Sequence, residues 1–367
     1  MAELSYRSLE FSNIPGWKSD DVGAALVPFA NCAAALKSQK NAQPPRYSYI
    51  TDLSRLCSQA AELIKSGDRL TAQDKRFFFE NNFEPYKIVH SDQIGLLTGY
   101  YEPALKASRI PSDQFKVPIY RRPHDLITKV CNELRGSENV KFTHMQSTEN
   151  GLKPFADRAS IEQGALAGRG LELLYLEDPV EAFILHVQGS GLLHMTDGTR
   201  IRIGYDGKNG YPYTSIGRYI AENGWLPKEA ITLSSLKAWL RSDPERGRNA
   251  MWQNKSFIFF KELGSTDTTC AQGAHNIPLT AGRSLAVDGG LHQIGLPIFV
   301  SSPTLNFITP DQHGLAKLLV AQDVGSAITG PERGDLFYGS GDIAGELAGR
   351  TKHACNFILL LPKGQII

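Results

Sequence analysis

The sequence predicts a mainly β protein whose helices are gathered near its N-terminus. Three observations predict this class. The 367 residues include 34 glycines and 20 prolines, which is typical of many turns between short strands. Helical periodicity is strongest in the first ninety residues, whereas after residue 85 most apolar runs are short and bounded by Gly or Pro. At roughly 150 residues per domain, the length predicts two domains.

Three helices are expected before residue 85. An alanine-rich stretch covers 22–36, and 52–67 carries an apolar stripe at helical spacing that Gly67 ends. Thr71 and Asp74 have the spacing of a capping box, which predicts that a third helix begins there.

Short strands are expected over most of the remaining chain. We also expect one helix at 214–223 closed by Gly224, long loops between 113 and 151, and a tight turn at 207–210, because Asn and Gly tolerate positive φ. The expected strands are 86–90, 95–101, 117–120, 171–176, 182–188, 192–195, 200–205, 256–260, 284–287, 297–301, 317–322 and 356–361.

Charge and cysteine usage argue against several classes of protein. The 39 basic and 38 acidic residues leave a net charge of +1, so no global field attracts the chain to nucleic acid or anionic lipid. The five cysteines lie far apart and form no C-x-x-C pair, which argues against a disulfide framework and a zinc site. Histidines with metal-ligand spacing are missing, and no window approaches the roughly 20 apolar residues of a membrane span. We therefore expect no bound metal.

Three short motifs mimic catalytic signatures but lack their context. GRSLA at 282–286 leads into a strand, whereas a nucleophile elbow opens a helix. The glycine-rich stretch 339–345 has no surrounding βαβ unit, so a plain turn is expected instead of a phosphate loop. DVGSA at 323–327 resembles an aspartic protease loop, but that chemistry needs two such loops and the chain has no matching second one.

The segment 320–350 combines Asp323, Asp335 and Asp342 with several glycines. Asp335 precedes the apolar run 336–338. A carboxyl on apolar ground has its charged form disfavoured, so its pKa rises and it can serve as a general acid. The residues alone leave open that Asp335 only caps a turn, and they favour Asp323 as a structural carboxylate that accepts hydrogen bonds.

Three other segments mix aromatic with polar residues: TGYYEP (98–103), QGSG (188–191) and YDGKNGY (205–211). A sugar has an apolar face and many hydroxyls, so a glycan groove combines aromatic platforms with amides, hydroxyls and carboxylates. Tyrosines on strands are also common core residues, so each segment by itself leaves both interpretations open.

Seven long motifs follow one another between about residues 94 and 362. They are LLTGYYEP (96–103), VPIYRRP (117–123), FILHVQGSG (183–191), GYDGKNGYPYTSIGRYI (204–220), NKSFIFF (254–260), PLTAGRSLAVD (278–288) and LLVAQDVGSAITGPERGDLFYGSG (318–341). In this order the sequence resembles the membrane-bound lytic murein transglycosylase A family.

The resemblance implies a two-domain fold. Residues 1–104 and 246–367 would together form a catalytic double-psi β-barrel domain with the N-terminal helices. Residues 105–245 would form a smaller inserted β-domain, and the glycan would lie in a groove between the two domains.

The resemblance also implies a reaction. Asp335 stands at the position of the family's catalytic aspartate, and Asp323 at that of its supporting carboxylate. As an acid, Asp335 would protonate the glycosidic oxygen between N-acetylmuramic acid and N-acetylglucosamine. As a base, it would then take the proton of the muramic C6 hydroxyl, which closes a 1,6-anhydro ring. This chemistry requires no cofactor and no second catalytic carboxylate.

Eight residues are expected to contact the glycan or support the site. Four follow the family pattern, three lie in the expected turn at 207–210 or beside it, and one either orients Asp335 or binds sugar. In that order they are Thr98, Tyr101, Gln188, Ser190, Asp206, Lys208, Asn209 and Asp342.

Location and partners follow from the substrate. Murein lies outside the cytoplasmic membrane, so we expect a periplasmic protein associated with the outer membrane, although residues 1–7 show neither a secretory signal nor a lipid-anchor cysteine. The expected partners are peptidoglycan glycan strands and other cell-wall enzymes, with no nucleic acid, and the expected state is a monomer.

Two alternatives stay open. One is a hydrolytic endoglycosidase with Asp335 as the acid and Asp323 or Asp342 as the base. The other is a cell-wall-binding protein without activity.

Overall fold

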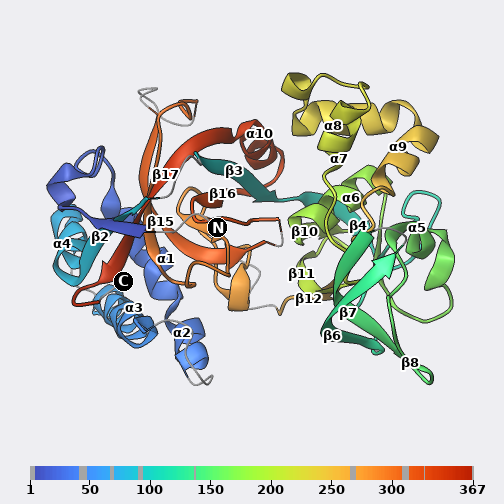
Figure 1. Ribbon diagram of the computed structural model, residues 1–367. Helices are drawn as coiled ribbons and strands as arrows, with labels where there is room; N and C mark the ends of the chain where they lie inside the picture. The colour runs from blue at the N-terminus through green and yellow to red at the C-terminus, as the bar shows by residue number, and fades with distance from the viewer. Residues whose placement is uncertain are drawn as a thin grey trace. The chain divides into compact units, whose positions relative to one another are not determined.

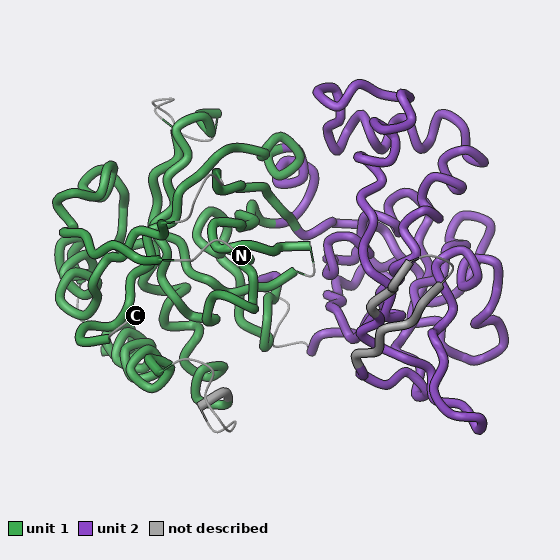
Figure 2. Tube along the Cα trace, viewed as in Figure 1, with its two compact units in different colours: residues 1–101, 272–339, 347–367 green, residues 102–271, 340–346 purple. Residues whose placement is uncertain are grey.

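The chain folds into two compact units (Figure 1, Figure 2). The computed structural model describes residues 5–40, 48–66, 70–89, 94–135, 138–264, 270–307, 314–325 and 327–365. The first unit comprises Met1–Tyr101, Gln272–Gly339 and Leu347–Ile367, and the second comprises Glu102–Ala271 and Ser340–Glu346. The second unit is therefore inserted twice into the sequence of the first.

Six strands of the first unit close into a barrel. Their order is β17-β14-β15-β13-β16-β3, and β3 also pairs with β17, which completes the circle. β13 runs parallel to β15 and antiparallel to β16. β2 and β1 extend the sheet from β17. The bounds are β1 Ser5–Ser8, β2 Phe83–Val89, β3 Gly95–Glu102, β13 Ser284–Val287, β14 Pro297–Ser302, β15 Leu315–Val324, β16 Arg333–Ser340 and β17 Lys352–Pro362.

Apolar side chains from these strands form the barrel core. Leu285, Leu319, Leu336 and Phe357 are almost fully buried and belong to one cluster. Burying side chains of this size stabilises the fold by about 1.5–3 kcal/mol each, which explains why the expected strands of this region are short, apolar and rich in branched residues.

The N-terminal helices pack against the barrel in a second cluster that is rich in phenylalanine. Figure 1 shows α1 to α4 gathered near β2, β15 and β17. Phe29 of α1 lies 5.8 Å from Phe79 of α4 and 5.6 Å from Phe83 between ring centroids. The bounds are α1 Leu26–Asn31, α2 Ala33–Lys40, α3 Ile50–Lys65 and α4 Ala72–Asn82.

The expected N-terminal helices are confirmed, with one change. Thr71 and Asp74 form the predicted capping box of α4, and α3 covers the expected stripe, although Gly67 lies outside the described residues. The helix expected at 22–36 is split. α1 ends at Asn31, because the N–H of the next residue, Cys32, bonds to the Phe29 carbonyl three residues back instead of continuing the α-helical pattern.

Among its described residues, the second unit contains a six-stranded sheet, a three-stranded sheet and five α-helices that lie wholly within it. The first sheet has the order β12-β11-β10-β4-β9-β5 and the second the order β6-β7-β8. The bounds are β4 Ala104–Ser108, β5 Val117–Tyr120, β6 Leu126–Arg135, β7 Glu138–Thr148, β8 Gly151–Lys153, α5 Arg158–Ser160, β9 Glu172–Leu176, α6 Pro179–Gln188, β10 Ser190–Met195, β11 Arg200–Lys208, α7 Ile216–Glu222, α8 Leu233–Ser242, α9 Pro244–Met251 and β12 Ile258–Glu262.

Three local predictions are wrong, and a fourth is right only in part. The strand expected at 182–188 is part of helix α6, and the long loops expected between 113 and 151 include the hairpin of β6 and β7. The turn expected at 207–210 is not a hairpin turn, because β11 continues through Lys208 after a bulge. The glycine-rich turn expected at 339–345 leads into helix α10, Asp342–Arg350.

The unit boundaries also differ from the expected domain boundaries at 104/105 and 245/246. The first lies between Tyr101 and Glu102, and the second between Ala271 and Gln272. The second boundary comes later because β12 pairs with β11 and so belongs to the inserted sheet. Residues 340–346 join the second unit because Ser340 and Gly341 both donate hydrogen bonds to the buried Glu102.

The predicted fold class is confirmed. The chain is mainly β and combines a closed barrel, as the double-psi expectation requires, with an inserted β-containing unit. The expected N-terminal helices are present, but helices are not confined to that region, because α5 to α10 begin at Arg158 or later.

Candidate active site

The barrel places Asp323 and Asp335 on two strands that flank β13. In the strand register, Ala286 of β13 is the partner of Asp323 on β15 and of Asp335 on β16. Residues paired in register project to the same face of a sheet. The two carboxylates therefore lie at the same level of the barrel, with the small side chain of Ala286 between them.

The Asp335 carboxyl is held by two donors. The Thr98 hydroxyl on β3 and the Arg333 guanidinium on β16 both donate to Oδ1 of Asp335. The Asp335 side chain is 20% exposed and the Arg333 side chain 18%. Arg333 also donates to the Gly334 carbonyl at 2.7 Å, which fixes the guanidinium beside the carboxyl.

These contacts correct the expected surroundings of Asp335. The sequence suggested a carboxyl on apolar ground, because the run 336–338 follows it. On a strand, however, adjacent side chains project to opposite faces, so Leu336 belongs to the buried core while Asp335 meets Arg333 and Thr98. The immediate environment of Asp335 is polar and charged.

Asp323 is the carboxyl with the perturbed proton affinity. Burial of its carboxyl raises its pKa to about 7, although the residue as a whole keeps some exposure. The Val324 N–H, which donates to its Oδ1 at 2.9 Å, and the nearby Tyr100 hydroxyl and Ala274 N–H oppose this rise, and the negative charge of Asp335 adds to it. Ala274 begins a turn in which His275 and Asn276 adopt positive φ of 56° and 58°, a strained conformation for residues with side chains.

Tyr100 places its hydroxyl near the same pair. Its pKa is raised well above 10 by burial and by the charges of Asp323 and Asp335. The hydroxyl is buried, and among the described residues no partner completes a hydrogen bond of good geometry with it. Its ring packs on Phe337 with 5.1 Å between centroids.

Gly99 allows β3 to come this close. A Cβ at this position would stand 2.7 Å from the Ala348 Cα of α10 and 2.7 Å from the Tyr338 ring. Only a residue without a side chain fits there. Gly99 therefore seats Thr98 and Tyr100, its two chain neighbours, against β16.

Tyr101, the other expected sugar contact on β3, is buried. Tyr101 is only 4% exposed, so its burial gives no support to a sugar contact. Since Thr98 and Tyr100 are two residues apart on a strand, they share a face, and Tyr101 points to the other one.

In the second unit, four expected contacts keep part of their surface. Gln188 ends α6, Ser190 begins β10, and Asp206 and Lys208 lie on β11, all partly exposed. Burial lowers the pKa of Lys208. Asp206 lies 3.9 Å from the Lys261 ammonium.

Asn209 has a structural environment. It is fully buried, and its amide nitrogen donates to the carbonyls of Ala156 and Lys255 at 2.9 and 2.8 Å. Its oxygen accepts from the Phe257 N–H at 2.9 Å. Both amide hydrogens are thus used inside the unit, which explains why Asn stands here and gives no support to a sugar contact.

Asp342 is exposed at the first position of α10. No hydrogen bond or ion pair joins it to Asp335 among the described residues, so it does not orient that carboxyl directly.

Two residues of the cluster were not singled out from the sequence, namely Arg333 and Tyr100. The signal for both is the strand period of two. Arg333 shares a face with Asp335, and Tyr100 shares a face with Thr98. Applying this period to β3 and β16 would have selected Tyr100 over Tyr101.

Comparison with known proteins places these residues in recognised segments. Residues 96–261 match the family model of the MltA specific insert domain, and residues 283–361 match that of the 3D domain. Thr98 and Tyr100 lie in the first segment, and Asp323, Arg333 and Asp335 lie in the second.

Solved structures and curated relatives agree with these matches. A membrane-bound lytic murein transglycosylase from Agrobacterium tumefaciens is 36% identical, with a TM-score of 0.85 and 98% of each chain covered. Escherichia coli MltA with bound chitohexaose is 26% identical, with a TM-score of 0.66, over 92% of this chain and 89% of that one. The membrane-bound lytic murein transglycosylase A of Vibrio cholerae is 34% identical over 262 residues, which are 70% of this chain but only 63% of that protein.

Proposed function

Because the chain belongs to the membrane-bound lytic murein transglycosylase A family, we propose that it cleaves peptidoglycan glycan strands without water. In this proposal Asp335 is both the acid and the base. The observation that carries it is the Asp335 carboxyl, partly exposed and held by Thr98 and Arg333 within the segment that matches the 3D domain.

The proposed reaction has two proton transfers. Asp335 in its acid form gives its proton to the β-1,4 glycosidic oxygen, and the bond to the muramic anomeric carbon breaks. The C6 hydroxyl of the same sugar then attacks that carbon while its proton passes to Asp335. The products are an N-acetylglucosamine end and a 1,6-anhydromuramic end, and Asp335 is again protonated. Because nucleophile and leaving group belong to one substrate, proximity replaces a separate water-binding step.

The geometry of Asp335 suits this double role. Thr98 and Arg333 both bind Oδ1, and among the described residues Oδ2 makes no hydrogen bond. We assign Oδ2 as the oxygen that exchanges the proton, with Oδ1 fixing the orientation of the carboxyl. A positive guanidinium on Oδ1 also stabilises the carboxylate that forms when the proton leaves.

Asp323 supports Asp335 through charge. Two neighbouring carboxylates resist simultaneous ionisation, and Asp323 has a pKa of about 7. Near neutral pH the pair therefore tends to keep one proton between its two carboxyls, and that proton is the one that Asp335 gives to the glycosidic oxygen. All groups assigned to the chemistry come from one unit of one chain, so a monomer suffices.

The proposed sugar contacts are Thr98, Gln188, Ser190, Asp206, Lys208 and Asp342, which all keep some exposure. A relative has been solved with bound chitohexaose, an oligomer of β-linked N-acetylglucosamine. Hydroxyl, amide, carboxylate and ammonium groups can each bond to the hydroxyls or acetamido groups of such a chain.

We propose that the protein acts where murein is found, in the periplasm. Its relatives are named membrane-bound. Among the described helices, none combines the length and the apolar character needed to cross a bilayer.

A hydrolytic endoglycosidase is the second candidate. The observation in its favour is Asp323, a second carboxyl at the level of Asp335 that could activate a water as a base. The two reactions differ in their products, since the lytic product is lighter by one water than the hydrolytic one.

Mass spectrometry of the soluble fragments released from purified peptidoglycan tests the proposal. The wild-type chain is expected to release anhydromuramic fragments, whereas Asp335→Ala is expected to lose at least about 10²-fold in rate, since general acid–base catalysis contributes roughly that much. Asp113→Ala serves as a matched control, because Asp113 is exposed and belongs to none of the proposed contacts, and it is expected to keep the anhydro product. Reducing muramic ends in place of anhydro ends, or full activity of Asp335→Ala, would overturn the proposal.

A further inference from the structure

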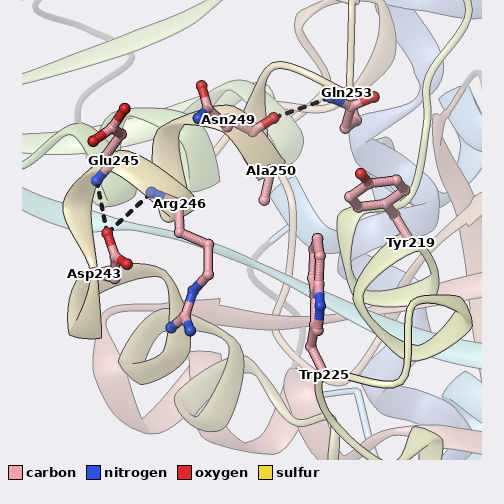
Figure 3. Close-up of a pocket in the computed structure, with 8 residues that line it drawn as sticks. All are labelled: Tyr219, Trp225, Asp243, Glu245, Arg246, Asn249, Ala250 and Gln253. Atoms are coloured by element: carbon pink, nitrogen blue, oxygen red, sulfur yellow. Dashed lines mark hydrogen bonds between the residues drawn. The ribbon is translucent and has the colours of Figure 1, made fainter.

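The second unit has a pocket that the proposed reaction does not use. It lies between α7, the loop that follows it, and α9, and its volume is about 370 Å³ (Figure 3). We call it the helix pocket. It is lined mainly by Tyr219, Trp225, Arg246, Asn249, Ala250 and Gln253, and also by Asp243 and Glu245 at the start of α9.

Trp225 offers the helix pocket a rigid aromatic surface. Its indole stacks on Trp239 with 5.3 Å between centroids and an angle of 17°, and the Arg246 guanidinium lies 4.2 Å from the Trp239 ring. Tyr219 packs against Trp225 at 5.6 Å and 78°. Although it is supported on these sides, Trp225 keeps 43% of its surface exposed. A large aromatic that is both fixed and exposed is a typical binding platform.

Amide groups stand beside this platform. Asn249 and Gln253 are exposed and four residues apart, so they lie on the same side of the α9 end, where Gln253 donates to the Asn249 carbonyl at 3.2 Å. Figure 3 shows both near Ala250, which lies between Arg246 and Tyr219 in this view. Oδ1 of Asp243 is already occupied, because it caps α9 by accepting from the N–H groups of Glu245 and Arg246.

This combination fits a sugar better than a wholly apolar or a strongly charged ligand. A pyranose ring presents C–H groups to an aromatic face and hydroxyl or acetamido groups to neighbouring amides. The positive charge of Arg246 partly balances the negative charges of Asp243 and Glu245. Because the pocket has little net charge, it does not favour a highly charged ligand. The volume lies at the small end of the range for ligand sites, as expected for a short stretch of glycan.

We propose that the helix pocket is a second glycan-binding site, which takes an N-acetylated hexopyranose of the same polymer. That the polymer is peptidoglycan rests on the proposed function. That the ligand is a sugar is inferred from the residues of the pocket alone. The helix pocket shares no residue with the Asp335 cluster, which belongs to the first unit. A second contact with one strand raises the local concentration of the remaining strand at the enzyme without any new catalytic group.

Binding of chitotriose, observed directly at the tryptophans, tests the sugar chemistry. The chain has four tryptophans, Trp17, Trp225, Trp239 and Trp252, so the full-length Asp335→Asn chain labelled with fluorotryptophan gives few fluorine signals. The proposal predicts a saturable shift of the Trp225 signal, with Trp252 unmoved because it lies outside the pocket and bonds to Glu162. An unmoved Trp225 signal up to the solubility limit of the sugar would overturn the proposal, as would an equal shift produced by an unrelated peptide.

Retention on insoluble peptidoglycan tests the role on the polymer. In the Asp335→Asn background, Trp225→Leu is expected to reduce retention about ten-fold, whereas Trp252→Leu, a matched loss of indole in the same unit, is expected to retain like the parent. Gln253→Ala should also lower retention, although it removes no aromatic group. This second variant keeps the proposal testable if Trp225→Leu fails to fold. Equal retention of the Trp225 and Trp252 variants would contradict the proposal. A wild-type chain that releases no fragments would count against the proposed function alone, since the sugar titration does not depend on cleavage.

Discussion

The proposed catalytic cluster (Thr98, Tyr100, Asp323, Arg333 and Asp335) depends on which face of its strand each residue occupies. Thr98 reaches Asp335 because it projects from the same face of β3 as Tyr100, whereas Tyr101 projects into a buried environment. Arg333 reaches Asp335 because the two residues are separated by one position on β16. A change of one residue in either register would replace these polar groups by core side chains.

Thr98→Val is expected to lower the turnover number about ten- to a hundred-fold, an effect larger than any rise in KM from the lost sugar contact. The substitution keeps the shape of the side chain but removes the hydroxyl that donates to Asp335, and a hydrogen bond to a charged group is worth about 1.5–3 kcal/mol. Steady-state rates on soluble glycan fragments measure both constants.

Thr98→Ser is the control for this prediction, because it restores the donor and should recover most of the turnover number. If Thr98→Val and Thr98→Ser lose activity equally, the hydroxyl does not position the carboxyl. If KM alone rises, Thr98 acts only on sugar binding.

Asp323 is expected to make stability depend on pH. Its pKa is about 7 in the folded chain and about 4 when unfolded, so between these values the folded state binds more protons. The free energy of unfolding contributed by Asp323 is therefore fully present below about pH 4 and falls as the pH rises to about 7. Asp323→Asn should flatten this fall, by a few kcal/mol at most, in urea unfolding measured at about pH 5 and about pH 8.

Asp342→Asn provides the matched control, since this carboxylate is exposed, and it should keep the pH dependence of the wild type. A wild type whose stability is equal at both pH values, or an Asp323→Asn variant with an undiminished slope, would contradict a buried Asp323 carboxyl.

At the scale of elements, local sequence signals predict where a helix begins or ends. They predict less well whether a buried apolar run is a helix or a strand. The capping box of α4 is a local interaction between Thr71 and Asp74, and the sequence suffices to predict it. Residues 182–188 are almost continuously apolar, a pattern that fits either a buried strand or a buried helix. The helix signals were present outside this window, because Asp178 caps α6 and Gly189 ends it with φ of 81°.

A buried ion pair joins the N-terminal segment to the barrel. Arg283 binds both oxygens of Asp20 at 2.9 Å, and Asp20 also accepts from the Leu318 N–H of β15. Arg283→Ala leaves the Asp20 carboxylate buried without its counter-charge, which costs about 3–5 kcal/mol. We expect a loss of this size in urea unfolding followed by circular dichroism.

Arg55→Ala is the comparison for this ion pair. Arg55 pairs with Asp52 at 3.4 Å, but the two side chains are 54% and 40% exposed, and such pairs are worth about 0–1 kcal/mol. Similar losses in the two variants would show that the Asp20–Arg283 pair does not anchor the N-terminal segment.

At the scale of the whole molecule, composition and local patterns predicted a β-rich chain but not its closure. The barrel closes because β3, near residue 98, pairs with β17, near residue 352, and no local pattern encodes a contact across that separation. The resemblance supplied the barrel and the insertion. The resemblance did not predict that the second unit boundary lies at 271/272, which depends on the pairing of β12 with β11. It also did not predict that the short segment between β16 and α10 joins the second unit, where Ser340 donates to Glu102.

The candidate site divides in the same way. Asp335 and Asp323 could be selected from the sequence with the help of the resemblance, and Thr98 from its motif. The pairing of Arg333 with Asp335 and the burial of Tyr101 and Asn209 depend on strand faces and packing. The helix pocket depends on how α7, α8 and α9 pack, and apart from Tyr219 its lining residues lie outside the seven motifs.

The central claim is that Asp335 cleaves the glycan by making the sugar attack itself. Digestion of peptidoglycan in water enriched in heavy oxygen, followed by mass spectrometry of the new muramic ends, tests it most directly. We predict anhydro ends that contain no oxygen from the solvent. Solvent oxygen at the anomeric carbon of the newly formed ends would contradict the claim, because water would then be the nucleophile.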